Sequence, residues 1–253
     1  MDLQVASSLA NLSSLSFTPA EFFICMGVLL VLLLFLANRL KPKCFYIIRH
    51  GETLLNQAHI KQGADGKLSP AGILQARALG TALQSLRIQE ICSSPFERAV
   101  ETATIMSEQL TKKITVSPLL AERKSPSEVI GKSVDDPEVQ RIVGLTESGF
   151  HEDTYRFSDE ENFQELIKRA KACLTYLSKR PGSRIVVVTH RAFLKILLSY
   201  LLYRDGLTAS DLVKLGFFNP VDNGGITVCI YHPWHPFSKT RGWEVVTYNQ
   251  VAS

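Results

Sequence analysis

The sequence predicts an α/β fold: a three-layer α/β/α sandwich with a mostly parallel central sheet, preceded by one N-terminal transmembrane helix. Over residues 41–253, short apolar runs rich in β-branched residues alternate with amphipathic segments of helical period. This alternation is typical of a parallel sheet covered by helices. The runs 45–48 and 185–188 are apolar or aromatic throughout, as expected of strands buried on both faces.

Local signals mark where the helices of this domain begin and end. Ser69-Pro70 and Ser94-Pro95 each place a capping residue before a proline, which is typical of a helix start. Pro181-Gly182 ends the longest amphipathic segment, and the last two strands are expected to pair at one edge of the sheet. The sequence predicts strands at 45–48, 88–92, 114–116, 185–189, 226–231 and 243–248, and helices at 70–83, 95–110, 159–180 and 193–203.

Residues 123–158 interrupt this alternation. The segment is long, polar and irregular, and loops of this length in a compact domain are either functional or disordered. We therefore expect a lid-like insertion over a binding site or, as the alternative, a disordered excursion. The catalytic domain as a whole is expected to cover residues 41–253.

The N-terminal segment is expected to be a membrane anchor. The uncharged run 22–37 is about 24 Å long as a helix, and extension to 20–40 brings it close to the roughly 30 Å of a hydrocarbon core. A signal peptide would need basic residues before the run, and residues 1–21 have none. A buried core helix is the other alternative. Residues 1–19 are expected to be disordered.

Basic residues directly follow the expected anchor. Arg39, Lys41 and Lys43 lie just after the run, and the positive-inside rule places such residues in the cytoplasm. We therefore expect a single-pass membrane protein whose C-terminal domain lies on the cytoplasmic side, with the membrane as a partner of residues 20–40.

The charge and cysteine content exclude several classes of protein. The chain has 28 basic and 24 acidic residues and a net charge of +4. This mildly basic balance suits an anionic substrate or a membrane surface, and no Lys/Arg block is dense enough to predict nucleic-acid binding. The five cysteines are scattered without a CxxC pair, which indicates neither a disulfide framework nor a zinc site. The composition favours no particular oligomeric state.

Two histidines follow apolar strands in this sequence. Arg49 and His50 come at the end of the run 45–48, and His190 comes at the end of the run 185–189. Open α/β sheets bind ligands beyond the carboxyl ends of their strands. A neutral histidine can act as a nucleophile toward phosphorus, and arginine binds phosphate oxygens with its planar fork. Arg98, in the first helical turn after another strand, adds a second arginine and a helix N-terminus.

Four motifs accompany these residues: RHGETLLN over 49–56, QGAD over 62–65, LSPAG over 68–72 and SSPFERAVETA over 93–103. With the apolar strand that ends in His190, they make the chain resemble the histidine phosphatase superfamily, the phosphoglycerate mutase-like group, in its phosphatase branch. The resemblance runs from about residue 44 to residue 248.

The resemblance implies a phosphohistidine intermediate at His50. It also implies a phosphate pocket built from Arg49, Arg98, His190 and Asn56, with no metal and no cofactor. In the phosphatase branch the proton donor often lies in an L-x-E stretch, which Leu120-Ala121-Glu122 matches. Glu122 would need a raised pKa to protonate a leaving alkoxide. An ion pair of Glu122 with Arg123 is the alternative to a catalytic role, and Glu128 is the alternative proton donor.

Two features depart from the family pattern. The residue after the second histidine is usually glycine, whereas this chain has Arg191. We expect its side chain to point outward from the helix start; a clash, or a third cation in the pocket, is the alternative. The stretch after Glu122 lacks the tyrosine-glycine and lysine-rich pattern of bisphosphoglycerate-dependent mutases, which favours hydrolysis over mutase chemistry.

Together these features predict a membrane-anchored phosphatase that hydrolyses phosphomonoesters through a phosphohistidine. The expected substrate is a phosphorylated small molecule or a phosphoprotein. Two alternatives stay open: a catalytically silent phosphate-binding or scaffold module, and a phosphoglycerate mutase.

Overall fold

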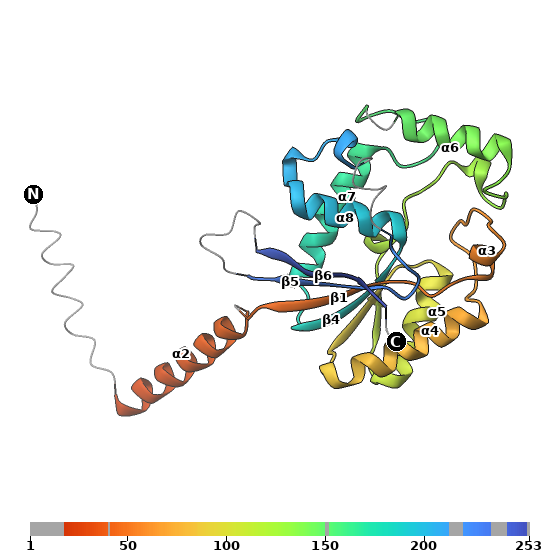
Figure 1. Cartoon of the computed structure of the whole chain (residues 1–253). Coiled ribbons are helices and arrows are strands. Elements are labelled where there is room, and N and C mark those ends of the chain that lie inside the picture. Colours follow the sequence, from red (N-terminus) through yellow and green to blue (C-terminus); the bar gives the residue numbers. More distant parts are fainter. Residues whose placement is uncertain (1–17, 40, 150–151, 213–219, 234–241, 252–253) are drawn as a thin grey trace, which may run out of the picture. The chain divides into compact units, whose positions relative to one another are not determined.

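The computed structural model describes residues 18–39, 41–149, 152–212, 220–233 and 242–251 (Figure 1). The chain divides into two compact units, Met1–Lys41 and Pro42–Ser253. The second unit contains the whole sheet and all the residues that the sequence singles out for chemistry.

The second unit is built on one six-stranded sheet of order β3-β2-β4-β1-β5-β6. The four strands from β3 to β1 are parallel, β5 runs antiparallel to β1, and β6 runs antiparallel to β5. The α/β fold is confirmed, and so is the edge pairing of the last two strands, which makes the sheet mixed. The strands are β1 (Lys43–Arg49), β2 (Glu90–Ser93), β3 (Ile114–Val116), β4 (Arg184–Thr189), β5 (Ile226–Tyr231) and β6 (Trp243–Gln250).

Helices cover both faces of this sheet. They are α3 (Leu54–Gln57), α4 (Pro70–Leu83), α5 (Glu97–Leu110), α6 (Pro137–Gly149), α7 (Phe163–Ser178) and α8 (Arg191–Tyr203), with 3-10 turns η2 (Gln84–Leu86), η3 (Pro118–Leu120), η4 (Ser127–Val129) and η5 (Arg204–Gly206). Ser69 caps α4 as expected, because its side chain accepts a hydrogen bond from the backbone of Gly72. The helix expected from Ser94-Pro95 instead begins at Glu97, with Phe96 as its N-cap and no side-chain cap.

The three layers follow from the alternation of side chains along the central strands. Phe45 and Ile47 of β1 pack with α7 and α8 in one buried cluster, whereas Ile48 packs with α4 and α5 in another. Successive strand residues point to opposite faces of a sheet, so a strand buried on both sides supplies both cores. Figure 1 shows α7 and α8 on one side of the strands and α4 and α5 on the other.

The segment 123–158 contains regular structure. It holds η4 and α6 and has a small apolar cluster of its own, made of Val129, Val139 and Ile142 with Val143 and Phe157 packed against it. This cluster explains how a polar stretch forms a defined wall beside the sheet. The hydrophobic period of α6 is short, and the sequence analysis therefore predicted no helix there.

The first unit contains one described helix, α2 (Pro19–Arg39). Within the described residues, no helix is both long enough and apolar enough to cross a membrane. The predicted transmembrane anchor over 20–40 is therefore not supported. Of residues 1–19, expected to be disordered, 1–17 lie outside the described residues and Pro19 begins α2. The expected cytoplasmic orientation stays a prediction.

Candidate active site

His50 lies just beyond β1 and is held on three sides. Its backbone N–H donates to the Thr189 carbonyl at 3.0 Å, and its carbonyl accepts from Asn223 Nδ2 at 3.0 Å. Its ring Nδ1 lies 2.7 Å from the Gly51 carbonyl oxygen, and its Nε2 lies 3.1 Å from Arg98 Nε, which donates. A carbonyl only accepts and an arginine only donates. Nδ1 therefore carries the hydrogen, and Nε2 carries the lone pair.

The surroundings of His50 keep its ring neutral. The side chain is 4% exposed, and burial, followed by the charges of Arg98 and Arg49, lowers its pKa well below the ordinary value of 6.5. Burial and nearby like charge both disfavour the imidazolium form. Nε2 is therefore an available nucleophile at neutral pH.

Arg98 is fixed in the first turn of α5 by backbone carbonyls. Besides its contact with His50, its Nη1 donates to the Gly63 carbonyl at 2.8 Å, and the side chain is 3% exposed. Burial lowers its pKa, but a guanidinium stays charged at neutral pH. The carbonyl contact aims the guanidinium at His50 before any ligand arrives.

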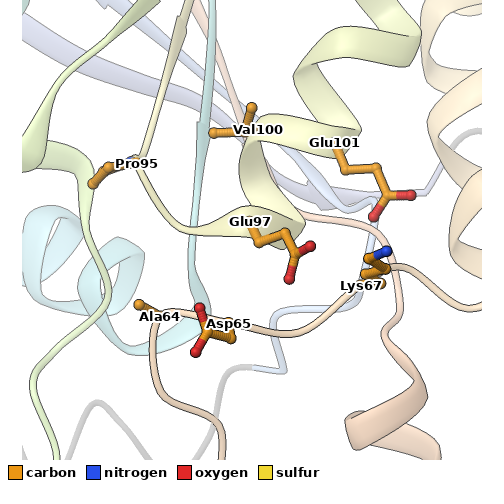
Figure 2. Close-up of a pocket in the computed structure, with 7 residues that line it drawn as sticks. All are labelled: Ala64, Asp65, Lys67, Pro95, Glu97, Val100 and Glu101. Carbon is orange, nitrogen blue, oxygen red and sulfur yellow. The ribbon is translucent and has the colours of Figure 1, made fainter.

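Two carboxylates of α5 hold the loop that supplies this carbonyl. Glu97 Oε2 accepts from the Gly66 N–H at 3.0 Å and Glu101 Oε2 accepts from the Leu68 N–H at 2.8 Å. Figure 2 shows both side chains directed from α5 toward the chain around Asp65 and Lys67, in a surface hollow. Glu97 and Glu101 of the SSPFERAVETA motif thus hold the loop whose carbonyl accepts from Arg98.

Arg49 is the last residue of β1, and its guanidinium is anchored on one side only. Its Nη1 donates to the Val221 carbonyl at 2.6 Å, whereas Nε is buried without a hydrogen-bond partner in the described structure. Burial, and next the charge of Arg191, lower its pKa to about 10, so it is still a cation at neutral pH. An unpaired buried N–H is costly, and a phosphate oxygen would satisfy it.

His190 packs against the ring of His50, and Ser94 contacts the His190 ring. It is fully buried, its ring centroid lies 5.1 Å from that of His50, and its Nε2 lies 2.7 Å from Ser94 Oγ. Ser94 Oγ also accepts from the Phe96 N–H at 3.2 Å, and we assign its own hydrogen to His190 Nε2, the choice that leaves a ring donor at Nδ1. Nδ1 then carries the ring hydrogen, and it is buried with no partner among the described residues.

Burial, and next the proximity of His50 and Arg98, lowers the pKa of His190 well below 6.5. The neutral ring therefore carries one N–H, which our assignment places at Nδ1. Ser94 was expected to cap a helix, but its side chain contacts a residue 96 positions away, and the helix begins at Glu97.

The predicted site residues meet at one cavity of about 440 Å³. Its wall includes Arg49, His50, Asn56, Arg98 and Glu122, whereas His190 reaches the site through its contact with His50. Glu128 is exposed and is not part of this wall, so the alternative proton donor does not lie at the site. The sequence analysis missed one carboxylate, Glu147 of α6, which does line the cavity.

Glu122 is held by the start of α8. One carboxylate oxygen accepts from the Phe193 N–H and the Arg123 N–H, each at 2.8 Å, and the other accepts from the Ala192 N–H at 3.1 Å. The contact with Arg123 is thus to its backbone. This arrangement satisfies N–H groups that a helix leaves open at its first turn, and it fixes the carboxyl group at the cavity wall. The catalytic role of Glu122 stays a prediction.

Arg191 departs from expectation. The sequence analysis expected it to point outward, with a third cation in the pocket as an alternative; Arg191 is exposed, but its side chain also lines the cavity and its charge lowers the pKa of Arg49. The opposite wall is built by residues 123–147, and the sequence does not show that this segment extends the cavity toward the start of α8.

The turn after His50 depends on a close crossing of two backbone segments. A Cβ on Gly72 would lie 2.0 Å from the Glu52 carbonyl oxygen, and one on Gly51 would lie 2.6 Å from the Gly72 carbonyl oxygen. Thr102 Oγ1 accepts from the Gly51 N–H at 3.0 Å and donates to the Arg98 carbonyl at 2.7 Å. Gly51, Gly72 and Thr102 of the sequence motifs therefore have structural roles that the sequence analysis left unassigned.

A neutral strand-end histidine beside the guanidinium of Arg98, with Arg49 in the same cavity wall, on an α/β/α sandwich, combines groups that suit a phosphate. Residues 45–244 match the histidine phosphatase superfamily (branch 1), and the chain belongs to this superfamily. Across the residues that the structure describes, no group of three or more His, Cys, Asp and Glu side chains is placed to hold a metal ion, and the independence from metals stays a prediction.

Relatives of two kinds resemble the chain. A probable phosphoglycerate mutase of Enterobacter sp. (strain 638) is 33% identical over 164 residues, which cover 62% of this chain and 74% of the relative. A phosphoserine phosphatase mutant from Entamoeba histolytica, solved with phosphoserine, has a TM-score of 0.66 at 23% identity over 83% of this chain and 98% of its own. A mycobacterial glucosyl-3-phosphoglycerate phosphatase has a TM-score of 0.62 at 20% identity over 82% and 99%. The two solved structures share the fold.

Proposed function

We propose that this chain is a phosphatase that hydrolyses phosphomonoesters through a phosphohistidine at His50. One observation carries the proposal: the lone pair of His50 Nε2 faces the Arg98 guanidinium inside a buried cationic pocket. A phosphoryl group placed there finds a nucleophile on one side and donors for its oxygens on the others. Phosphoryl transfer needs little beyond this positioning and charge stabilisation.

The first step transfers the phosphoryl group to the enzyme. His50 Nε2 forms a bond to phosphorus as the bond between phosphorus and the ester oxygen breaks. The Arg98 Nε–H, which donates to Nε2 in the free protein, then donates to a phosphoryl oxygen instead. Arg49 Nε and His190 Nδ1, both buried and unpaired among the described residues, donate to the remaining oxygens. The leaving alkoxide takes a proton from the carboxyl group at the cavity wall, for which Glu122 is our proposal.

The second step returns the enzyme to its starting state. Water attacks phosphorus on the side that the alcohol has left, the N–P bond breaks, and inorganic phosphate leaves. The proton of the attacking water passes to the same carboxylate, which is thereby recharged as an acid. His50 regains its neutral ring with the lone pair on Nε2.

The dimensions of the cavity favour a small molecule over a phosphoprotein as the substrate. A volume of about 440 Å³ with walls from both the sheet edge and residues 123–147 falls in the range of small-molecule pockets. A folded phosphoprotein would have to insert its phosphorylated side chain alone into this enclosure.

Rapid mixing with a labelled aryl phosphate tests the proposal. Quenching in alkaline denaturant, in which the N–P bond survives, should trap one labelled phosphohistidine per chain. The variant His50→Ala should be folded by circular dichroism but should yield neither the adduct nor free phosphate. Binding of the ester with neither an adduct nor release of phosphate would instead support the silent phosphate-binding module, and full turnover by His50→Ala would overturn the mechanism.

The 33% sequence identity to a probable phosphoglycerate mutase favours mutase activity as a second candidate. The two activities separate in one coupled assay with 3-phosphoglycerate, run with and without bisphosphoglycerate. Hydrolysis should release inorganic phosphate in both cases. Formation of 2-phosphoglycerate that depends on bisphosphoglycerate would identify a mutase.

A further inference from the structure

The edge strand β6 contains a β-bulge near its end. Ile226 of β5 pairs with Gln250, whereas Val228, two residues further along β5, pairs with Thr247, three residues back along β6. Asn249 lies inside this irregular stretch and has a positive φ of 49°, a left-handed conformation that asparagine tolerates better than most residues. A bulge bends its strand and redirects a side chain, and bulges are frequent beside active sites.

The bulge directs the Asn249 side chain onto the loop 220–225. Its Oδ1 accepts from the Asp222 N–H at 2.9 Å, and its Nδ2 donates to Asp222 Oδ2 at 2.8 Å. The Asn249 N–H donates to Thr227 Oγ1 at 3.3 Å, and Thr227 is fully buried. A Cβ on Gly225 would lie 2.1 Å from Asn249 Oδ1, so the amide packs directly against the loop.

The loop 220–225 in turn holds the last residue of β1 and the residue after it. The Val221 carbonyl accepts from Arg49 Nη1 at 2.6 Å, and Asn223 Nδ2 donates to the His50 carbonyl at 3.0 Å. The Val221 carbonyl anchors the Arg49 guanidinium on one side. The position of the loop therefore decides where this guanidinium points.

Asp222 also places a negative charge near Arg49. Burial lowers the pKa of Arg49, and the charge of Asp222 is among the influences that oppose this shift. A nearby carboxylate stabilises the charged form of a buried guanidinium. By holding Asp222, Asn249 therefore fixes a charge that supports Arg49 as well as the loop that aims it.

We propose that Asn249 is a positioning residue for phosphoryl transfer, which acts through the loop 220–225 on Arg49 and His50 without touching the substrate. The proposal rests on the proposed function of the same site. It assigns a role in catalysis to the last strand of the sheet, which lies outside every motif of the sequence. A small displacement of a group that binds the phosphate is costly in rate.

Variants on both sides of the contact test the proposal with p-nitrophenyl phosphate. Asn249→Gly keeps the positive φ accessible but removes both side-chain hydrogen bonds, and kcat/KM should fall about 5- to 20-fold. Asp222→Asn retains an acceptor for Asn249 Nδ2 and should be more active than Asp222→Ala. Arg87→Gly, at an exposed position that also has a positive φ, should leave kcat/KM unchanged.

A double-mutant cycle separates positioning from a general loss of stability. Arg49→Lys keeps a charge but removes the planar fork whose direction Asn249 sets. In that background, adding Asn249→Gly should change kcat/KM by less than about threefold. A substitution that merely loosens the domain should instead reduce kcat/KM by the same factor in both backgrounds.

The outcomes separate this proposal from the one on which it rests. If the unmodified chain fails to hydrolyse p-nitrophenyl phosphate, the proposed function fails and the positioning role fails with it. If it hydrolyses that ester and Asn249→Gly is equally active, only the positioning role is overturned. The same factor of loss with Arg49 and with Arg49→Lys would likewise overturn it, as would an equal loss in Arg87→Gly. A loss that Arg49→Lys suppresses would support it.

Discussion

Each of the two buried histidines offers one particular nitrogen because a neighbour fixes its tautomer. The Gly51 carbonyl holds the hydrogen of His50 on Nδ1, and the Ser94 hydroxyl leaves that of His190 on Nδ1. His50 thus presents a lone pair where His190 presents a donor. The same side chain therefore serves as nucleophile and as phosphate ligand, and the difference comes from atoms outside either ring.

Replacement of Ser94 by alanine should reduce activity without abolishing the fold. Without the hydroxyl, the His190 ring hydrogen can move to Nε2, and the donor to the phosphoryl group is lost. We expect kcat/KM for an aryl phosphate to fall about 10- to 100-fold, and Ser94→Thr to recover most of it. Long-range ¹H–¹⁵N spectra should show the His190 tautomer change in Ser94→Ala. An unchanged tautomer together with lost activity would contradict a positioning role.

Glu122 can be tested apart from its contacts with α8. A proton donor matters for a poor leaving group and hardly at all for p-nitrophenolate. In Glu122→Gln, kcat for an alkyl phosphate should therefore fall about 100-fold or more, and kcat for p-nitrophenyl phosphate much less. If the side chain only holds the start of α8, both substrates should lose activity equally. Glu147→Gln, at the same cavity, is the matched variant, and a selective loss there would move the donor role to Glu147.

The residues that make the site could be read from the sequence only in part. Arg49, His50 and His190 follow buried strands, and strand ends converge by topology, so their meeting was predictable. Ser94 and Arg191 could not be placed correctly, because their roles depend on contacts across the fold. Ser94 meets a residue 96 positions away, and Arg191 faces a wall built by residues 123–147.

At the scale of elements, the crossing of the turn after β1 over the first turn of α4 fixes the position of His50. Gly51 and Gly72 allow two backbones to approach more closely than any Cβ would permit. Thr102 of α5 then binds the same turn. Three elements separated in sequence are thereby tied to one peptide beside the nucleophile.

Gly72→Ala should destabilise the domain strongly. Its Cβ would meet the backbone of Glu52 at 2.0 Å, and backbone atoms cannot yield as a flexible side chain can. We expect the free energy of unfolding to fall by about 2–4 kcal/mol, measured by urea denaturation with an unchanged m-value. Gly144→Ala, inside α6 with no atom within 4 Å of the new Cβ, should be neutral or gain up to about 1 kcal/mol. Equal effects at both positions would show that the crossing is not tight.

The elements with strong periodicity were predictable, and the others were not. The central strands are apolar throughout, and α4 and α7 carry regular apolar positions, so local sequence determines both their type and their place. α5 begins at Glu97, later than the Ser94-Pro95 pair predicts, and the Ser94 side chain contacts His190. α6 is short, and its apolar residues pack into a small cluster formed by residues 123–158 alone. Sequence periodicity does not predict this packing.

At the scale of the whole molecule, folding carries two histidines out of water into a cationic interior. His50 and His190 are 4% and 0% exposed, and burial with the charges around them lowers both pKa values well below 6.5. In the unfolded chain each would titrate near 6.5. The unfolded state therefore binds more protons than the folded state just below that pH, and acid favours unfolding.

The free energy of unfolding should thus decrease as the pH falls from about 7 to about 5.5, with the unfolded chain binding about one proton more per histidine. Denaturant titrations at closely spaced pH values give this slope directly, and the window ends before most carboxylates titrate. His50→Asn should remove about half of the slope, because one of the two buried rings is gone. Inorganic phosphate should raise stability across the window. A slope near zero, or one that His50→Asn leaves unchanged, would mean that the rings take up protons in the folded state, which contradicts a neutral nucleophile held by its surroundings.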